Sequence, residues 1–418
     1  MTTARQPGSS DKFSDEPSNL PLMAYLASCL LAFIGGHIIN YSIIFLALEW
    51  FNSHALAGIG YGLCFGPPLI LGWFAGVYCD RYSPRRVILT AQNSYLVSLV
   101  LLSIALNSTE ETKQPLLLIA AFFSGVGWSF VAPARFATLP FYVKPNKLTG
   151  ATIALNLMVM TGFGLAPMIL KQIQVHFDWQ TVFVVAAVLF VVSSSLLLPL
   201  RFNFDGKPAE KAVQEIKSSL TFVHRSDFIK PFLLLATITY LLMGPMQVIL
   251  PTIAKQMLGL NETAQGNYLS LIAFSLIVGG LSAMWLKNKG RIGLNMLLAI
   301  TVAGAGLGYL SQEDNLSLSV LVLILASISG GIAISFIVAG LQAYSVDEHR
   351  GRIMSFYSII SQCIPAASGI GAGILAQAFT PFIALQIIAG IIVLSALTCL
   401  VAMSNIRRLE NFEHGQSK

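Results

Sequence analysis

Charged residues are scarce in this chain. They make up 11% of its 418 residues, whereas hydrophobic residues make up 55% and the mean hydropathy is +0.72. A soluble globular protein carries about 25% charged residues, so the composition excludes that class. Long apolar runs with few charges are typical of helices that cross a membrane. The sequence therefore predicts an all-α polytopic membrane protein.

Motifs for cofactors and catalysis are also missing. The five cysteines form no C-x-x-C pair and lie in or beside apolar runs, so we interpret them as small buried residues without a disulfide or metal role. The chain has no phosphate-binding Walker loop, zinc motif, haem motif or nucleophilic serine elbow. We therefore expect neither an enzyme nor a bound cofactor.

The net charge of +6 is spread over short loops between the apolar runs. This distribution favours the lipid bilayer as partner and gives no reason to expect nucleic acid. Twelve runs are long enough to cross roughly 30 Å of hydrocarbon. They are residues 22–49, 56–79, 87–107, 117–139, 149–170, 180–200, 231–254, 266–286, 293–311, 318–342, 353–377 and 382–403.

Loop charge predicts the orientation. The two tails and alternate loops together hold 21 Lys and Arg, the remaining loops hold three, and Arg135 lies inside a span. Because Lys and Arg gather in cytoplasmic loops, both termini are predicted to be cytoplasmic.

The spans divide six and six around the only long loop. Its residues Val213, Ile216, Leu220 and Val223 recur at helical spacing, which predicts an amphipathic helix on the membrane surface. The predicted parts are a disordered tail (1–21), a first six-helix bundle (22–200), a linker (201–230), a second six-helix bundle (231–403) and a second tail (404–418).

A short polar loop, Gly76-Val-Tyr-Cys-Asp80-Arg81-Tyr-Ser-Pro-Arg85-Arg86, separates the second and third spans. It resembles the signature loop of the major facilitator superfamily, which usually has Gly in place of Ser83. The resemblance implies two six-helix pseudo-repeats and transport by alternating access. It also implies that Asp80 lies at the N-terminus of span 11 as a latch between the halves, with Gly76 and the three arginines at the same seam.

Two further stretches narrow the resemblance. Pro133-Ala134-Arg135 and Gly351-Arg352-Ile-Met-Ser-Phe-Tyr357 are similar to stretches of bacterial exporters related to the enterobactin exporter and to macrolide efflux pumps. This likeness implies export across a bacterial inner membrane, with a siderophore or a drug-like molecule as substrate.

Polar residues inside the spans are the candidate transport site. His37, Asn40 and Tyr41 share one face of the first span. Arg135 has three alternative interpretations: it pairs with Asp80, it binds an anionic substrate, or it extends its charged end to the membrane surface. Four more candidates are equally well explained as hydrogen bonds between helices: Asn156, Tyr240, Gln247 and Gln362.

The spans contain almost no carboxylate, since Glu49 and Asp80 stand only at span ends. A permanently cationic substrate is therefore less expected than a neutral, zwitterionic or anionic one. His37 is either a packing residue or a proton carrier, because imidazole titrates near neutral pH. The stretch Gly162-Phe-Gly-Leu-Ala-Pro167 partly matches the family's antiporter signature, which favours proton exchange.

These features predict a monomeric secondary transporter that works by alternating access. Proton-linked export of a small amphiphilic molecule such as a siderophore is the first interpretation. A drug or macrolide pump, a lysophospholipid flippase, an importer and a non-transporting receptor stay open as alternatives.

The charge bias yields a topology test. In a cysteine-free background, an impermeant thiol reagent added outside should label a cysteine placed at Thr112 and should miss one at Lys211. Labelling of both positions from outside would show that the orientation is wrong.

Overall fold

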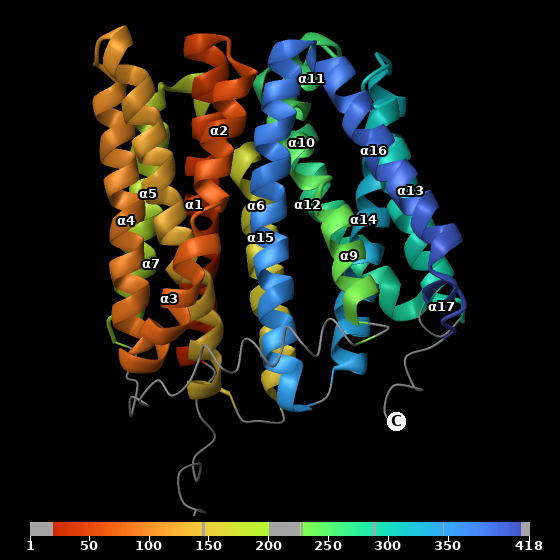
Figure 1. Cartoon of the computed structure of the whole chain (residues 1–418). Helices are drawn as coiled ribbons and strands as arrows, with labels where there is room; N and C mark the ends of the chain where they lie inside the picture. Colours follow the sequence, from red (N-terminus) through yellow and green to blue (C-terminus); the bar gives the residue numbers. More distant parts are fainter. Residues whose placement is uncertain are drawn as a thin grey trace, which may run out of the picture.

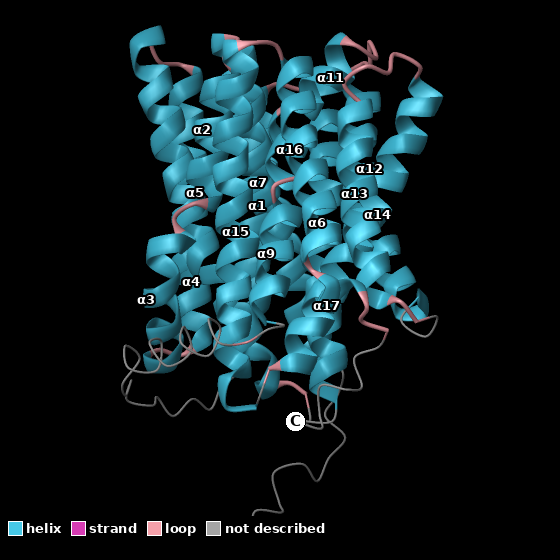
Figure 2. Cartoon of the chain, turned by 45° about the vertical axis from the view of Figure 1, so that its right-hand side comes forward, coloured by secondary structure: helices cyan, strands magenta, loops and turns pink. Residues whose placement is uncertain are grey.

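The computed structural model describes residues 20–143, 147–199, 226, 229–286, 290–345 and 347–410. The predicted amphipathic helix of the linker and nearly all of the predicted N-terminal tail lie outside these ranges. Figure 2 shows helices and loops alone in the described part. Its helices include twelve candidate membrane spans, which confirms the predicted fold class.

In its described residues the first bundle consists of seven helices and one 3-10 turn, because one of its spans is broken. These elements are α1 (Leu20–Phe51), α2 (His54–Phe65), α3 (Pro68–Arg81), α4 (Pro84–Leu106), α5 (Glu110–Thr138), η1 (Leu139–Phe141), α6 (Leu148–His176) and α7 (Trp179–Leu197). Helix α1 lies at the centre, contacting α2, α5, α6 and α7, and is buried on all faces from Ala32 to Ala47.

The second bundle contains nine helices in the described residues. They are α9 (Ile229–Tyr240), α10 (Met243–Val248), α11 (Leu250–Gln256), α12 (Glu262–Leu286), α13 (Ile292–Tyr309), α14 (Leu316–Tyr344), α15 (Asp347–Ala378), α16 (Pro381–Ala402) and α17 (Ser404–Arg407). In Figure 1 the red-to-yellow helices lie on one side and most green-to-blue helices on the other, with α6 and α15 between them.

Proline explains the breaks in two of the spans. Pro67 and Pro68 separate α2 from α3, and Pro245 and Pro251 lie in α10 and α11. A proline has no backbone N–H and its ring clashes with the preceding turn, so a helix bends or breaks there. The stretch predicted as one span at 231–254 is therefore three consecutive helices.

The C-terminal segment folds back onto the second bundle. Ile406 is fully buried, and the Gly293 N–H donates a 3.0 Å hydrogen bond to the Leu409 carbonyl. The first residues of the predicted tail 404–418 therefore pack against the start of α13, and only residues 411–418 lie outside the described part.

We call the end of the molecule that carries connections 52–53, 107–109 and 177–178 the outer end, after the predicted topology. In the half of the molecule nearest the outer end, four hydrogen bonds connect described residues of the first bundle to described residues of the second. Glycines bring the bundles close there: a methyl group on Gly58 would collide with the backbone of Gly369 and Gly373. The outer halves of α2 and α15 are thus in direct backbone contact, and this end is closed.

This packing predicts that Gly373→Val opens the outer end, because a side chain there would meet the His54 carbonyl and Gly58. Gly371→Val is the matched control on the same helix, since a side chain at Gly371 meets nothing within 4 Å. An impermeant maleimide should label a cysteine at the buried Thr252 faster in the first variant than in the control. Equal labelling would contradict the role of the glycine contact.

Candidate functional site

His37 lies at the middle of α1, enclosed by aromatic rings from three other helices. The centroid of its ring is 6.4 Å from that of Phe65 on α2, 5.7 Å from Trp128 on α5 and 5.4 Å from Phe163 on α6. The side chain is 5% exposed. The three rings and the histidine form an aromatic cage around the middle of the first candidate span.

Several polar atoms in and beside this cage have no hydrogen-bond partner. Both ring nitrogens of His37, the Tyr41 hydroxyl, the Trp128 indole nitrogen and the Gln247 side-chain oxygen are buried and unpaired. A buried polar group without a partner costs about 1–3 kcal/mol. The cluster therefore has unused hydrogen-bonding capacity for water, a proton or a ligand.

Asn40 has a hydrogen-bond partner inside the bundle, whereas the Tyr41 hydroxyl has none. The Asn40 side-chain oxygen accepts a 2.9 Å hydrogen bond from the Ser124 hydroxyl on α5, so that oxygen is satisfied inside the bundle. The Tyr41 ring stacks on Phe45 and Phe163. Of the three polar residues predicted on one face of the first span, Asn40 is held by a hydrogen bond, whereas His37 and Tyr41 keep unpaired atoms.

Gln247 and Tyr240 lie on the second bundle. The Gln247 amide donates a 2.8 Å hydrogen bond to the Tyr61 hydroxyl of α2 and so connects the two bundles. The Tyr240 hydroxyl is 2.7 Å from the Tyr357 hydroxyl of α15. Gln247 is thus connected to the aromatic cage through Tyr61, whose ring centroid is 4.8 Å from that of Phe65, whereas Tyr240 connects two helices of its own bundle.

Asn156 and Gln362 are hydrogen-bonded within their own helices. The Asn156 amide donates to the Thr152 carbonyl and the Gln362 amide to Ser358, each one turn earlier in its own helix. Asn156 is exposed and Gln362 is partly buried. The structure gives neither residue a contact with the other candidate side chains.

Arg135 is fully buried inside the first bundle. Its Nη1 donates to Cys29 Sγ at 2.9 Å and to Ser28 Oγ at 3.3 Å, and its Nη2 donates to Ser193 Oγ at 3.2 Å. The guanidinium carbon lies 5.8 Å from the centroid of the Phe33 ring. The cation thus ties α5 to α1 and α7.

This position corrects one expectation for Arg135. With 0% exposure, the side chain does not extend to the membrane surface. Its acceptors are two hydroxyls and a thiol, with no carboxylate within 4 Å among the described side chains. A planar fork of five N–H donors suits such a divided set of acceptors.

The signature loop joins α3 to α4, as predicted. The backbone of Gly76 and Asp80 is helical, and the Asp80 side chain lies outside the described part, so its latch role stays a prediction. Arg81, Arg85 and Arg86 form no ion pair with any described side chain. The side chains of Asp80, Asp347 and Glu348 lie outside the described part, so the ion pairs of these arginines at the seam stay a prediction.

Sequence reasoning missed an ion pair between the bundles. Lys171, near the end of α6, lies with its Nζ 2.5 Å from Glu262 Oε2 at the start of α12, and 4.0 Å from the centroid of the Phe45 ring. Lys171 counted only as one of the three basic residues in the remaining loops, and Glu262 carried no expectation. Their opposite charges in the outer connections after spans 5 and 7 were the available signal.

The pair borders a cavity of about 610 Å³ at the outer end, which we call the outer vestibule. Both bundles line it, and its charged residues are Glu49, Lys171, Asp178, Lys255 and Glu262.

Two vestibule carboxylates already have partners. The backbone N–H and the hydroxyl of Thr181 donate to Asp178 Oδ1 at 2.9 and 2.8 Å, which lowers the pKa of that carboxyl. The Trp179 indole N–H donates to Glu49 at 3.1 Å.

The fold and the enclosed polar cluster define a multi-pass membrane transporter that works by alternating access. The model of the Major Facilitator Superfamily matches residues 25–369. The chain belongs to this family.

Individual relatives are more distant. A staphyloferrin A transporter of Staphylococcus aureus is 24% identical over 187 residues, which are 44% of this chain and 47% of that protein. The matched region thus spans about half the length of this curated relative.

Solved structures show the same fold. A bacterial homologue of the human lysosomal transporter Spinster, in an inward-facing and unoccupied conformation, is similar with a TM-score of 0.69 at 15% identity, over 94% of this chain and 97% of that one. The nucleoside transporter NupG is similar with a TM-score of 0.71 at 14% identity, over 92% of this chain and 99% of that one. At these identities the likeness concerns the fold alone.

The contacts of Arg135 predict a loss of stability for Arg135→Lys. An ammonium cannot serve Ser28, Cys29 and Ser193 from one plane, and a hydrogen bond to a charged group contributes about 1.5–3 kcal/mol. The melting temperature in detergent should fall by several degrees. Ser195→Ala, which removes an exposed hydroxyl bonded to its own helix, should leave it unchanged. An unaltered melting temperature in Arg135→Lys would mean that the network does not stabilise the bundle.

Proposed function

We propose that this protein exports a small amphiphilic molecule, anionic or neutral, in exchange for protons across a bacterial inner membrane, and that siderophores are the first substrates to test. The observation that carries the proposal is His37, whose two ring nitrogens are buried and unpaired inside the aromatic cage. Imidazole is the one side chain with an unperturbed pKa near 6.5. It is therefore suited to load and release a proton within the membrane.

The missing carboxylates support histidine as the coupling group. The only acidic residues at the predicted spans are Glu49 and Asp80, at their ends. A neutral His37 would accept a hydrogen bond from a donor group of the substrate, and apolar parts of the substrate would pack on Phe65, Trp128 and Phe163. Protonation of His37 would remove that acceptor, so the proton and the substrate would compete for one site, and such competition couples their movements in opposite directions.

The staphyloferrin A transporter supports a siderophore as substrate, although it matches only about half of the chain. The aromatic cage itself favours a second candidate, an efflux pump for drugs or macrolides, because aromatic walls bind apolar molecules with little regard to their detailed shape. Transport of siderophores and of drugs by the same vesicles distinguishes the two.

The proposal predicts that His37→Gln abolishes the pH dependence of transport. In everted vesicles, exchange of one proton per substrate makes steady-state accumulation change about tenfold for each pH unit across the membrane, since a pH unit corresponds to about 1.4 kcal/mol. The parent should follow this slope, and the variant should accumulate substrate to the same level at every gradient.

His176→Gln is the matched control, because His176 is an exposed histidine at the end of α6. This variant should retain the slope of the parent. A His37→Gln variant that also retains it would identify His37 as a packing residue. Transport that is independent of the gradient in the parent would instead exclude proton coupling altogether.

A further inference from the structure

Lys171 is a nearly buried cation placed where the two bundles must separate. Its side chain is 8% exposed, whereas that of its partner Glu262 is 41% exposed. Beside this pair, Gly266 of α12 packs against the Pro167 carbonyl and the Lys171 side chain of α6. Any movement that opens the outer end therefore draws Glu262 away from Lys171.

Opening would leave Lys171 without its ion-pair partner. Its ammonium lies against the Phe45 ring, and a charge in such surroundings is costly unless it is paired. Glu49 of the same bundle attracts Lys171 but forms no ion pair with it, and its carboxylate accepts from Trp179, whereas Asp178 accepts from Thr181. The remaining charged residue, Lys255 on α11, repels Lys171.

We propose that Lys171 is an exchangeable anion site: it binds Glu262 while the outer end is closed, and a carboxylate of the transported molecule when that end opens. The outer vestibule, with about 610 Å³ of volume, has room for such a molecule beside Lys171. The site deepens the proposed function, on which it rests for an anionic substrate. It makes the opening of the outer end depend on the presence of the anion.

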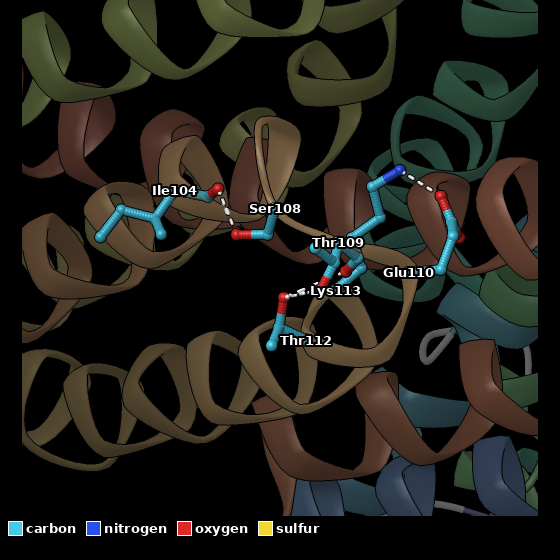
Figure 3. Close-up of polar contacts among 6 residues, drawn as sticks. All are labelled: Ile104, Ser108, Thr109, Glu110, Thr112 and Lys113. Carbon is cyan, nitrogen blue, oxygen red and sulfur yellow. Dashed lines mark hydrogen bonds and ion pairs between the residues drawn. The ribbon is translucent and has the colours of Figure 1, made fainter.

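The chain contains a matched control pair. Lys113 and Glu110 also form an ion pair at the outer end, with 2.6 Å between Nζ and Oε1. Figure 3 shows that these two side chains come from a single helix, α5. Lys113→Gln therefore removes a similar outer-end charge without affecting a contact between the bundles.

The experiment measures distances between spin labels on the purified protein in nanodiscs, in a cysteine-free parent with labels at the exposed residues Gln180 and Leu316. Citrate is the carboxylate probe, compared with chloride at equal ionic strength. In the parent, citrate should increase the population with widely separated outer ends.

The variants separate the two parts of the proposal. Lys171→Gln and Glu262→Gln should each raise the open population about fivefold without citrate, a change typical of losing one partly exposed ion pair. Only Glu262→Gln, which keeps the lysine, should still respond to citrate. The double variant Lys171→Glu with Glu262→Lys should restore the closed population, and Lys113→Gln should match the parent in every condition.

Each contrary result is informative. Distances in Lys171→Gln and Glu262→Gln that equal those of the parent would overturn the closing role of the pair. A parent that ignores citrate, or a Lys171→Gln variant that responds to it as the parent does, would overturn anion exchange at Lys171. Because the assay uses no proton gradient and no transport, these results are independent of whether the vesicle experiments support proton-linked export.

Discussion

The structure depends on one constraint: inside the hydrocarbon layer there is no water, so every polar side chain must find its partner within the protein. Arg135 meets this constraint in part: its two terminal nitrogens donate to hydroxyls and a thiol on α1 and α7, and its Nε has no partner in the described part. Lys171 meets it through a carboxylate from the other bundle. Neither ring nitrogen of His37 has a partner there. The proposed roles follow this difference: Arg135 would stabilise one bundle, Lys171 would stabilise one conformation, and His37 would be available to a ligand.

Close contact between the bundles follows from the same constraint. Lipid tails offer no hydrophobic driving force between helices, so helix association relies on packing and on a few hydrogen bonds. Glycines on α2 and α15 let the backbones touch at the outer end, and the contacts of His54 with Thr252 and Gln377 cross the same gap. A surface made of small residues and weak bonds can separate and re-form at little cost. Alternating access requires that property of an interface.

Hydropathy and loop charge were enough to predict the twelve spans, because the apolar length needed to cross a bilayer is fixed by its thickness. The position of His37 in the middle of a span was also predictable, since a histidine in an apolar run stands out in the sequence, and its role stays a prediction. The partners of Arg135 were not predictable: Ser28 and Ser193 are 107 and 58 residues away, and only the packing of three helices brings them together. The hydrogen bonds of Asn156 and Gln362 within their own helices were not predictable for a similar reason, because helical spacing shows which residues share a face but not which partner each side chain takes. Lys171 and Glu262 were overlooked because each lies near a span end, where a charge is expected for topology alone.

The distribution of basic groups also constrains how proton and substrate could be coupled. Arginine does not exchange its proton at physiological pH, so the proposed function gives Arg135 no part in proton transfer. An imidazole gains and loses a proton near neutral pH, so in the proposed function protonation of His37 would release the substrate. A lysine held by a carboxylate changes its partner rather than its charge, and Lys171 is therefore suited to report which conformation the bundles adopt.

A carrier that moves an anion against a proton gradient needs both kinds of variable group, one that responds to the proton and one that responds to the opening of the outer end. In this chain they lie on α1 and α6, two helices that pack against each other, so a change at either group can alter the position of the other.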